Sequence, residues 1–151
     1  YNEANNISSA YLVRDKFSNS YVLESDLYLY NQDLIRKYEY HSNFLGFKVD
    51  RTDDWCLDTK IGIITIEKVG GLDCYQMCGI SYYDKETGKQ MEKDIKEVFM
   101  SPGGKERYWE QVMLDIRKNN YKIYLRECKS EDIIEIDTFN ELKAIDKTYD
   151  V

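Results

Sequence analysis

The segment YVLESDLYL, residues 21–29, is the part of the sequence from which the rest can be interpreted. Aromatic and aliphatic residues typical of a β-strand lead into two carboxylates, Glu24 and Asp26, and helix-compatible residues 31–35 follow. In open α/β sheets, ligands bind beyond the carboxyl ends of the strands. The segment therefore predicts a strand that ends in two acids at a ligand-binding edge.

Length and hydropathy indicate a folded globular domain. The chain has 151 residues, which is the usual length of one domain, and 42% of them are hydrophobic. The mean hydropathy is −0.64, and no run of 18 apolar residues occurs in the sequence. We therefore predict a single domain over residues 1–151 with no membrane span.

Net charge and cysteine spacing bear on whether the chain binds nucleic acid or zinc. The formal net charge is −7, and the 21 basic residues are scattered among 28 acids, so a nucleic-acid partner is not expected. The four cysteines form no CxxC pair, and His41 is the single histidine. Because zinc sites need such clusters, we interpret the cysteines as core or sheet residues of a protein in a reducing cytoplasm.

Apolar periodicity and turn residues predict alternating helices and strands. Asp84 is a suitable N-cap for a helix, Gly70-Gly71 resembles a hairpin turn, and Thr138 with Glu141 fits a capping box. The expected helices are a short one after Asn5-Asn6, a short one with Leu34, Ile35 and Tyr38 that ends by residues 41–43, one from residue 85 to about 100, one over about 105–118, and one after Thr138. The expected strands, after the one in residues 21–29, are 44–49, 55–58, 61–68, 74–83, 121–126 and 133–136.

This alternation predicts an α/β fold in which helices flank a mixed sheet. Two of its strands end in acids, the first at Glu24 and Asp26 and the last at Glu135 and Asp137. Mg²⁺ prefers a few carboxylates together with phosphate oxygens, so aspartates from two strand ends could hold a metal–nucleotide complex. The alternative is that these acids are helix caps and solvated charges, which are common at such positions.

Aromatic residues beside acids form a second candidate site. Trp55 follows Asp53-Asp54, and Tyr108-Trp109 precedes Glu110. Aromatic faces supplemented by a carboxylate bind quaternary ammonium groups. The alternative for Trp109 is a place in the apolar stripe of its helix, whereas Tyr108 lies one position off that stripe.

Taken together, several short motifs resemble the bacterial CTP:phosphocholine cytidylyltransferases of the sugar-phosphate nucleotidyltransferase superfamily. The motifs follow in order and with similar spacing: Asn5-Asn6 with Ser8 or Ser9, residues 19–26, Trp55, residues 79–84, Tyr108-Trp109-Glu110 and residues 135–138. The resemblance implies a Rossmann-like fold. It also implies transfer of CMP from CTP to phosphocholine, which gives CDP-choline and pyrophosphate.

The resemblance also implies roles for individual residues. Asp26 and Asp137 match the two family aspartates that hold Mg²⁺. Trp55, Tyr108 and Glu135 match the positions used around the choline headgroup. In the family's pair of acids Glu24 replaces an aspartate, which leaves the metal position at Asp26 intact.

One departure from the family pattern is large. The family begins with a strand and a glycine-rich loop that carries arginine and a Pro-Lys pair, and Tyr1 aligns after that whole segment. The sequence is therefore expected to be the C-terminal two-thirds of the domain, with apolar surface that favours a homodimer. Two alternatives remain, a sugar-1-phosphate nucleotidyltransferase and a non-catalytic binding module with the same fold.

Because the glycine loop and its cations would neutralise the triphosphate, the 151-residue chain alone is expected to have negligible transferase activity. The measurement is CDP-choline formation from CTP, phosphocholine and Mg²⁺ by the purified chain. CDP-choline synthesis above the protein-free background would contradict this expectation.

Overall fold

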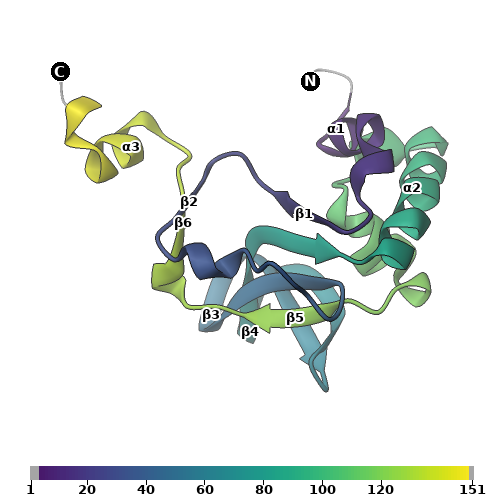
Figure 1. Ribbon diagram of the computed structural model, residues 1–151, viewed down its shortest axis with the longest axis horizontal. Coiled ribbons are helices and arrows are strands. Elements are labelled where there is room, and N and C mark those ends of the chain that lie inside the picture. The colour runs from purple at the N-terminus through teal and green to yellow at the C-terminus, as the bar shows by residue number, and fades with distance from the viewer. Residues whose placement is uncertain (1–3, 150–151) are drawn as a thin grey trace.

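The computed structural model describes residues 4–149 and has a mixed sheet flanked by helices, as predicted (Figure 1). The ends of the predicted domain, residues 1–3 and 150–151, lie outside the described part. The helices are α1 (Ile7–Leu12), α2 (Lys85–Met100) and α3 (Phe139–Ile145), with a π-helix at Val112–Ile116 and several short 3₁₀ turns. The strands are β1 (Ser20–Leu23), β2 (Leu27–Leu29), β3 (Asn43–Lys60), β4 (Ile63–Tyr83), β5 (Tyr124–Glu127) and β6 (Ile133–Glu135).

The larger sheet has the strand order β1-β4-β3-β5. β1 pairs with β4 and β4 with β3 in antiparallel fashion, whereas β5 runs parallel to β3 from Asn43 opposite Tyr124. β2 and β6 form a separate two-stranded antiparallel sheet. The segment 21–29 therefore contains two short strands, and its two acids lie in the link between the larger and the smaller sheet.

The middle of the chain is simpler than predicted, because two long strands replace the four expected ones. The hairpin turn lies at Ile61-Gly62, where φ values of 53° and 73° match the two central positions of a type I′ turn. The prediction of a turn at Gly70-Gly71 was wrong, since these residues lie within β4 with Gly71 opposite Thr52. Here the ribbon bends back on itself, so that Cys56 of β3 faces both Lys68 and Gln76 of β4.

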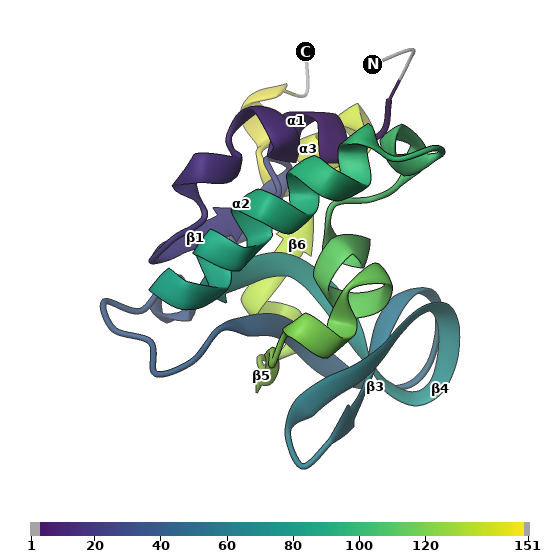
Figure 2. The ribbon, with the colours of Figure 1, turned by 90° about the vertical axis from the view of Figure 1, so that its right-hand side faces the viewer.

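The helix α2 forms as its sequence pattern predicts. Asp84 caps it by accepting a 2.9 Å hydrogen bond from the Thr87 amide, and Met91, Ile95 and Val98 are buried. Figure 2 shows α1 beside α2 on one face of the sheet. Apolar burial between these helices and the strands supplies the main core, which also contains Phe44, Leu57 and Tyr83.

The helix predicted over residues 105–118 forms only in part. Its first turn is a separate 3₁₀ turn at Gly104–Glu106, and the later part is the π-helix. The amide of Arg117 bonds to the carbonyl of Val112 at 2.9 Å, which is the wider spacing of a π-turn. Trp109, Val112 and Met113 are buried as the apolar stripe predicts, and such π segments are frequent at functional sites.

The C-terminal helix α3 has the predicted capping box. Glu141 accepts hydrogen bonds from the Thr138 and Asp137 amides, and its own amide donates to the Thr138 hydroxyl at 3.2 Å. No residue of α3 is buried, and the helix stands away from the sheet in Figure 1.

The four cysteines are all free and buried, in agreement with their interpretation as core residues. No helix in residues 4–149 is long and apolar enough to cross a membrane.

A buried ion pair holds the loop after β2 against β5. The Arg126 guanidinium bonds to the Glu39 carboxylate and the Leu34 carbonyl, and the two charged side chains are only 11% and 5% exposed. Removing one partner of such a pair leaves a buried charge without compensation.

We therefore predict that Arg126→Met lowers the free energy of unfolding by about 3–5 kcal/mol in urea denaturation. The matched control is Lys16→Met, because Lys16 pairs with Asp15 on the surface with both side chains more than half exposed. Equal stability of Arg126→Met and the control would show that the buried pair contributes nothing.

Candidate active site

Pairing of β2 with β6 brings the two acidic segments together. Leu27 lies opposite Glu135, and the Ile136 amide donates a 2.9 Å hydrogen bond to the Asp26 carbonyl. This bond continues the ladder past the ends of both strands, so acids from distant parts of the sequence share one edge.

Glu24, Asp26 and Glu135 form an acid cluster at this edge. Each offers one carboxylate oxygen, and these oxygens all lie within 4.8 Å of one another. Oxygen donors of this kind suit a hard divalent cation, and Mg²⁺ usually takes only one or two of them together with phosphate and water. The arrangement therefore fits a metal whose remaining positions are filled by a phosphate ligand.

Gly79 makes room for the Glu24 side chain. The Glu24 amide bonds to the Gly79 carbonyl at 3.0 Å, and φ of Gly79 is +63°. A Cβ at this position would lie 2.3 Å from Glu24 Oε2, so any larger residue would displace the carboxylate. Glycine at residue 79 thus allows both the left-handed backbone and the observed position of the Glu24 carboxylate.

Negative charge is concentrated at the acid cluster. Partial desolvation, followed by repulsion from Asp137, Glu24 and other nearby acids, raises the pKa of Glu135 to about 7. Desolvation and the charges of Asp26, Asp54 and Asp137 also raise the pKa of Glu24. A bound cation would relieve this repulsion.

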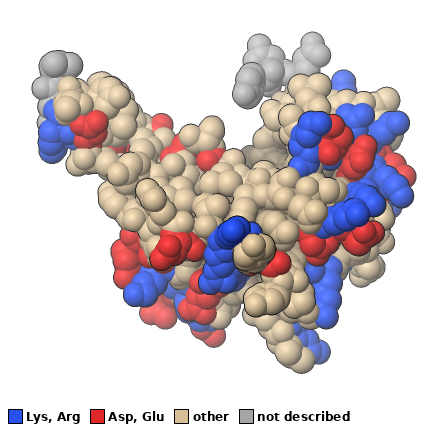
Figure 3. All heavy atoms as spheres, in the orientation of Figure 1, with Lys and Arg blue, Asp and Glu red and all other residues tan. Residues whose placement is uncertain are grey.

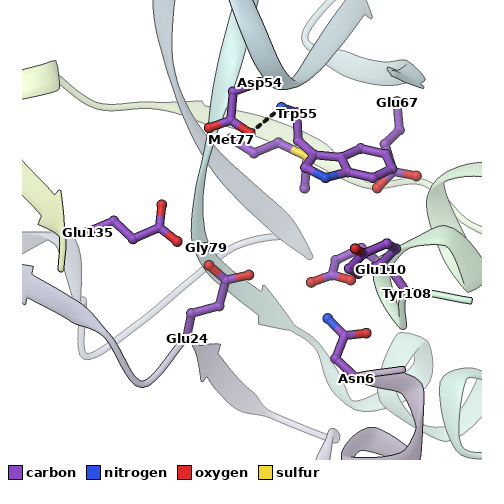
Figure 4. A pocket seen from close by; sticks show the side chains of 10 residues that line it. All are labelled: Asn6, Glu24, Asp54, Trp55, Glu67, Met77, Gly79, Tyr108, Glu110 and Glu135. Atoms are coloured by element: carbon purple, nitrogen blue, oxygen red, sulfur yellow. Dashed lines mark hydrogen bonds between the residues drawn. The ribbon is translucent and has the colours of Figure 1, made fainter. Parts of the chain in front are cut away.

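Next to the acid cluster lies a cavity of about 140 Å³. Its lining residues come from the N-cap of α1, the β1–β2 link, β3, β4, the segment before the π-helix and β6 (Figure 4). They are Asn6, Glu24, Asp54, Trp55, Glu67, Met77, Gly79, Tyr108, Glu110 and Glu135. A cavity of about this volume accepts a group the size of benzene, so a substituted ammonium group fits.

Two aromatic rings form one side of the cavity. The centroids of Trp55 and Tyr108 are 5.4 Å apart and their planes meet at 63°. Trp55 is half-buried and Tyr108 is 41% exposed, so neither ring is part of the closed core. Ring faces next to carboxylates make this surface suitable for a cation.

Glu110 is a buried residue of the cavity wall. Its side chain is 5% exposed, and its Oε2 atom has no hydrogen-bond partner within the described residues. Burial raises the pKa of this carboxyl to about 8. Glu67, on another wall, has a pKa raised to about 7 by burial and by the charge of Asp115.

A second, more open cavity of about 460 Å³ shares Asn6, Glu24 and Glu135 with the first and extends between α1 and β1. Among the residues that the structure describes, no lysine or arginine lines either cavity. In Figure 3, Lys and Arg atoms are mixed with Asp and Glu atoms over α2, and Asp and Glu atoms border the notch between α3 and α1.

The structure brings four of the five predicted site residues together. Asp26 and Glu135 belong to the acid cluster, and Trp55 and Tyr108 face the cavity beside it. Asp137 lies outside the set of oxygens within 4.8 Å, although its charge acts on Glu24 and Glu135. The roles of these residues stay predictions.

Sequence reasoning missed part of the site, because it treated Glu24 as a variant beside the metal position and gave no role to Glu67 or Glu110. The Tyr108-Trp109-Glu110 motif contained a signal for Glu110. Glu110 directly follows Trp109, and both side chains are buried just before the π-helix begins at Val112.

The fold defines the class of protein. The structure superimposes on that of a CTP:phosphocholine cytidylyltransferase from Streptococcus pneumoniae with a TM-score of 0.83 and 24% identity, covering 98% of this chain and 65% of the other. A putative glucose-1-phosphate thymidylyltransferase from Bacillus anthracis gives a TM-score of 0.65 at 12% identity, covering 99% of this chain and 62% of the other. The fold is therefore the Rossmann-like fold of the nucleotidyltransferases.

Sequence comparison identifies more specific relatives than the fold does. No family model matches the chain. A choline-phosphate cytidylyltransferase from S. pneumoniae is 26% identical, and the alignment covers 97% of this chain and 64% of the relative. A 2-aminoethylphosphonate cytidylyltransferase from Lancefieldella rimae is 28% identical, over 99% of this chain and 62% of the relative.

These alignments confirm the resemblance inferred from the motifs. The chain is homologous to bacterial choline-phosphate cytidylyltransferases over nearly its whole length, and it spans slightly less than two-thirds of the length of these curated relatives.

Burial of Glu110 predicts a specific pH dependence of stability. Unfolded glutamate ionises near pH 4.5, whereas folded Glu110 keeps its proton up to about pH 8. The unfolded state therefore binds fewer protons between these values, and stability falls as the pH rises through this window.

Glu110→Gln should remove this contribution, so that its stability relative to wild type rises by a few kcal/mol, at most about 5, between pH 5 and pH 8. Urea denaturation at several pH values measures the difference, and Glu106→Gln is the exposed control. Parallel curves for wild type and Glu110→Gln would contradict the raised pKa.

Proposed function

We propose that residues 1–151 form part of one nucleotidyltransferase domain, in a cytoplasmic enzyme that transfers CMP from CTP to phosphocholine. A phosphate oxygen of phosphocholine would attack the α-phosphorus of CTP. The bond from that phosphorus to the β-phosphate oxygen would break, giving CDP-choline and pyrophosphate. Two of the relatives reported as similar are choline-phosphate cytidylyltransferases, which supports this choice.

The observation that carries the proposal is the aromatic and acidic cavity beside the acid cluster. Trp55 and Tyr108 would hold the trimethylammonium group through their ring faces, and the carboxylates would balance its charge. Glu24 and Glu135 belong both to the cavity wall and to the acid cluster. A headgroup in the cavity would therefore direct its phosphate towards the cluster.

We propose Mg²⁺ as the cofactor, held by Asp26 and Asp137 as the resemblance implies, with Glu24 and Glu135 as neighbouring donors. Nucleotidyltransferases of this superfamily generally use a divalent metal. The metal would neutralise charge on the reacting phosphates. The protein's own contribution is to orient the acceptor phosphate, since phosphoryl transfer depends mainly on alignment and electrostatic stabilisation.

The alternatives differ in what the cavity should bind. A sugar-1-phosphate transferase needs a site for neutral hydroxyls, and a cavity with several carboxylates and two aromatic rings favours a cation instead. A non-catalytic module would keep cation binding and lose nucleotide binding. Self-association remains a further proposal, based on exposed apolar residues such as Phe139 of α3, and light scattering tests it.

Trp55→Ala is predicted to weaken choline binding by about 5- to 30-fold, which corresponds to loss of a partly desolvated cation–π contact of about 1–2 kcal/mol. Isothermal titration of choline into the chain measures the effect. Tyr40→Ala is the control, because Tyr40 is 93% exposed and does not line the cavity.

The neutral carbon isostere of choline, titrated in parallel, should bind weakly to wild type and be less sensitive to Trp55→Ala. Unchanged choline affinity in Trp55→Ala, or equal binding of choline and its isostere, would contradict a cation site at Trp55.

A further inference from the structure

One group of the cavity is not explained by binding of a quaternary ammonium ion. Glu110 is 95% buried, its Oε2 atom has no partner within the described residues, and its side chain reaches into the cavity in Figure 4. A buried polar atom without a hydrogen bond costs about 1–3 kcal/mol. An unsatisfied group that faces a cavity can be completed by a ligand or a water molecule bound there.

The chemistry of the ligand decides whether it can satisfy Glu110. A trimethylammonium group has no N–H, so it can offer Glu110 its charge but no hydrogen bond. An ammonium group with N–H donors can offer both, and charge-assisted hydrogen bonds are about twice as strong as neutral ones. The unpaired Oε2 atom therefore matches an N–H-bearing headgroup.

The rest of the wall is consistent with such a ligand. Among residues 4–149, two aromatic rings, Trp55 and Tyr108, line the cavity. Glu24 and Glu67 add carboxylates to its wall, and Met77 also lines it. A quaternary ammonium group uses aromatic faces and nearby negative charge, but it cannot donate a hydrogen bond to any of these carboxylates. This cavity has acceptors on several sides.

We propose that Glu110 is a specificity-determining residue that lets the cavity accept primary ammonium headgroups of the ethanolamine type in addition to choline. The inference rests on the proposed function, because it concerns the same acceptor site. It adds that the enzyme's acceptor class is the phosphorylated amino alcohols, methylated or not, with Glu110 as the acceptor of the N–H hydrogen bond.

The test uses Glu110→Met, which keeps the length of the side chain and removes both oxygens, with Glu110→Gln as the variant that keeps one acceptor oxygen. Choline and ethanolamine are titrated into each protein by calorimetry. In wild type, the two dissociation constants should lie within about tenfold of each other. Glu110→Met should weaken ethanolamine binding by about tenfold, as expected for loss of a charged hydrogen bond, and leave choline binding within about twofold.

Glu110→Gln should retain more ethanolamine affinity than Glu110→Met. The inference is overturned if choline binds and ethanolamine does not, or if Glu110→Met weakens both ligands equally. These outcomes leave the proposed function intact. If neither ligand binds to wild type, the cation site of the proposed function fails as well. The experiment therefore distinguishes failure of the Glu110 inference from failure of the proposed function.

Discussion

The pairing of β2 with β6 is the interaction on which the site depends. Two three-residue strands, far apart in the sequence, align Leu27 with Glu135 and add a hydrogen bond from the Ile136 amide to the Asp26 carbonyl. Without this ladder, repulsion between the carboxylates would drive the two segments apart. Backbone hydrogen bonds therefore hold together side chains whose charges oppose their proximity, until a cation is bound.

In the cavity, too, the fold holds carboxylates in positions that are unfavourable for their charge. Glu110 and Glu67 occupy positions where an apolar residue would be more stable, and their raised pKa values record that cost. Glu110 is buried with one oxygen that has no partner among the described residues, and carboxyls with strongly shifted pKa values are common at functional sites. The acid cluster, the paired rings and the buried carboxyls all favour a positively charged ligand beside a metal-bound phosphate.

The sequence predicted the parts of the molecule that local chemistry determines. Asp84 and Thr138 start their helices as expected, because capping depends on neighbours within one turn. The turn at Ile61-Gly62 was missed because an isoleucine at positive φ has no local signal, and Gly70-Gly71 gave a stronger but misleading one. Of the candidate site, the strand-end acids Asp26 and Glu135 and the aromatic residues Trp55 and Tyr108 were recognised as candidates from the sequence, and the family resemblance implied their roles. Glu110 was not assigned a role, because its burial beside the cavity depends on tertiary packing that helical periodicity does not predict.

The most direct test of the account is to map a paramagnetic divalent ion on the chain. Mn²⁺ titrated at substoichiometric amounts should selectively broaden the backbone amide NMR signals of residues 24–27 and 135–137, and Asp26→Asn should reduce this broadening strongly. Signals from the surface acids of α2 should be unaffected at the same concentration. Uniform broadening over all acidic segments, or none at residues 24–27 and 135–137, would contradict a cation site formed by the β2–β6 pairing.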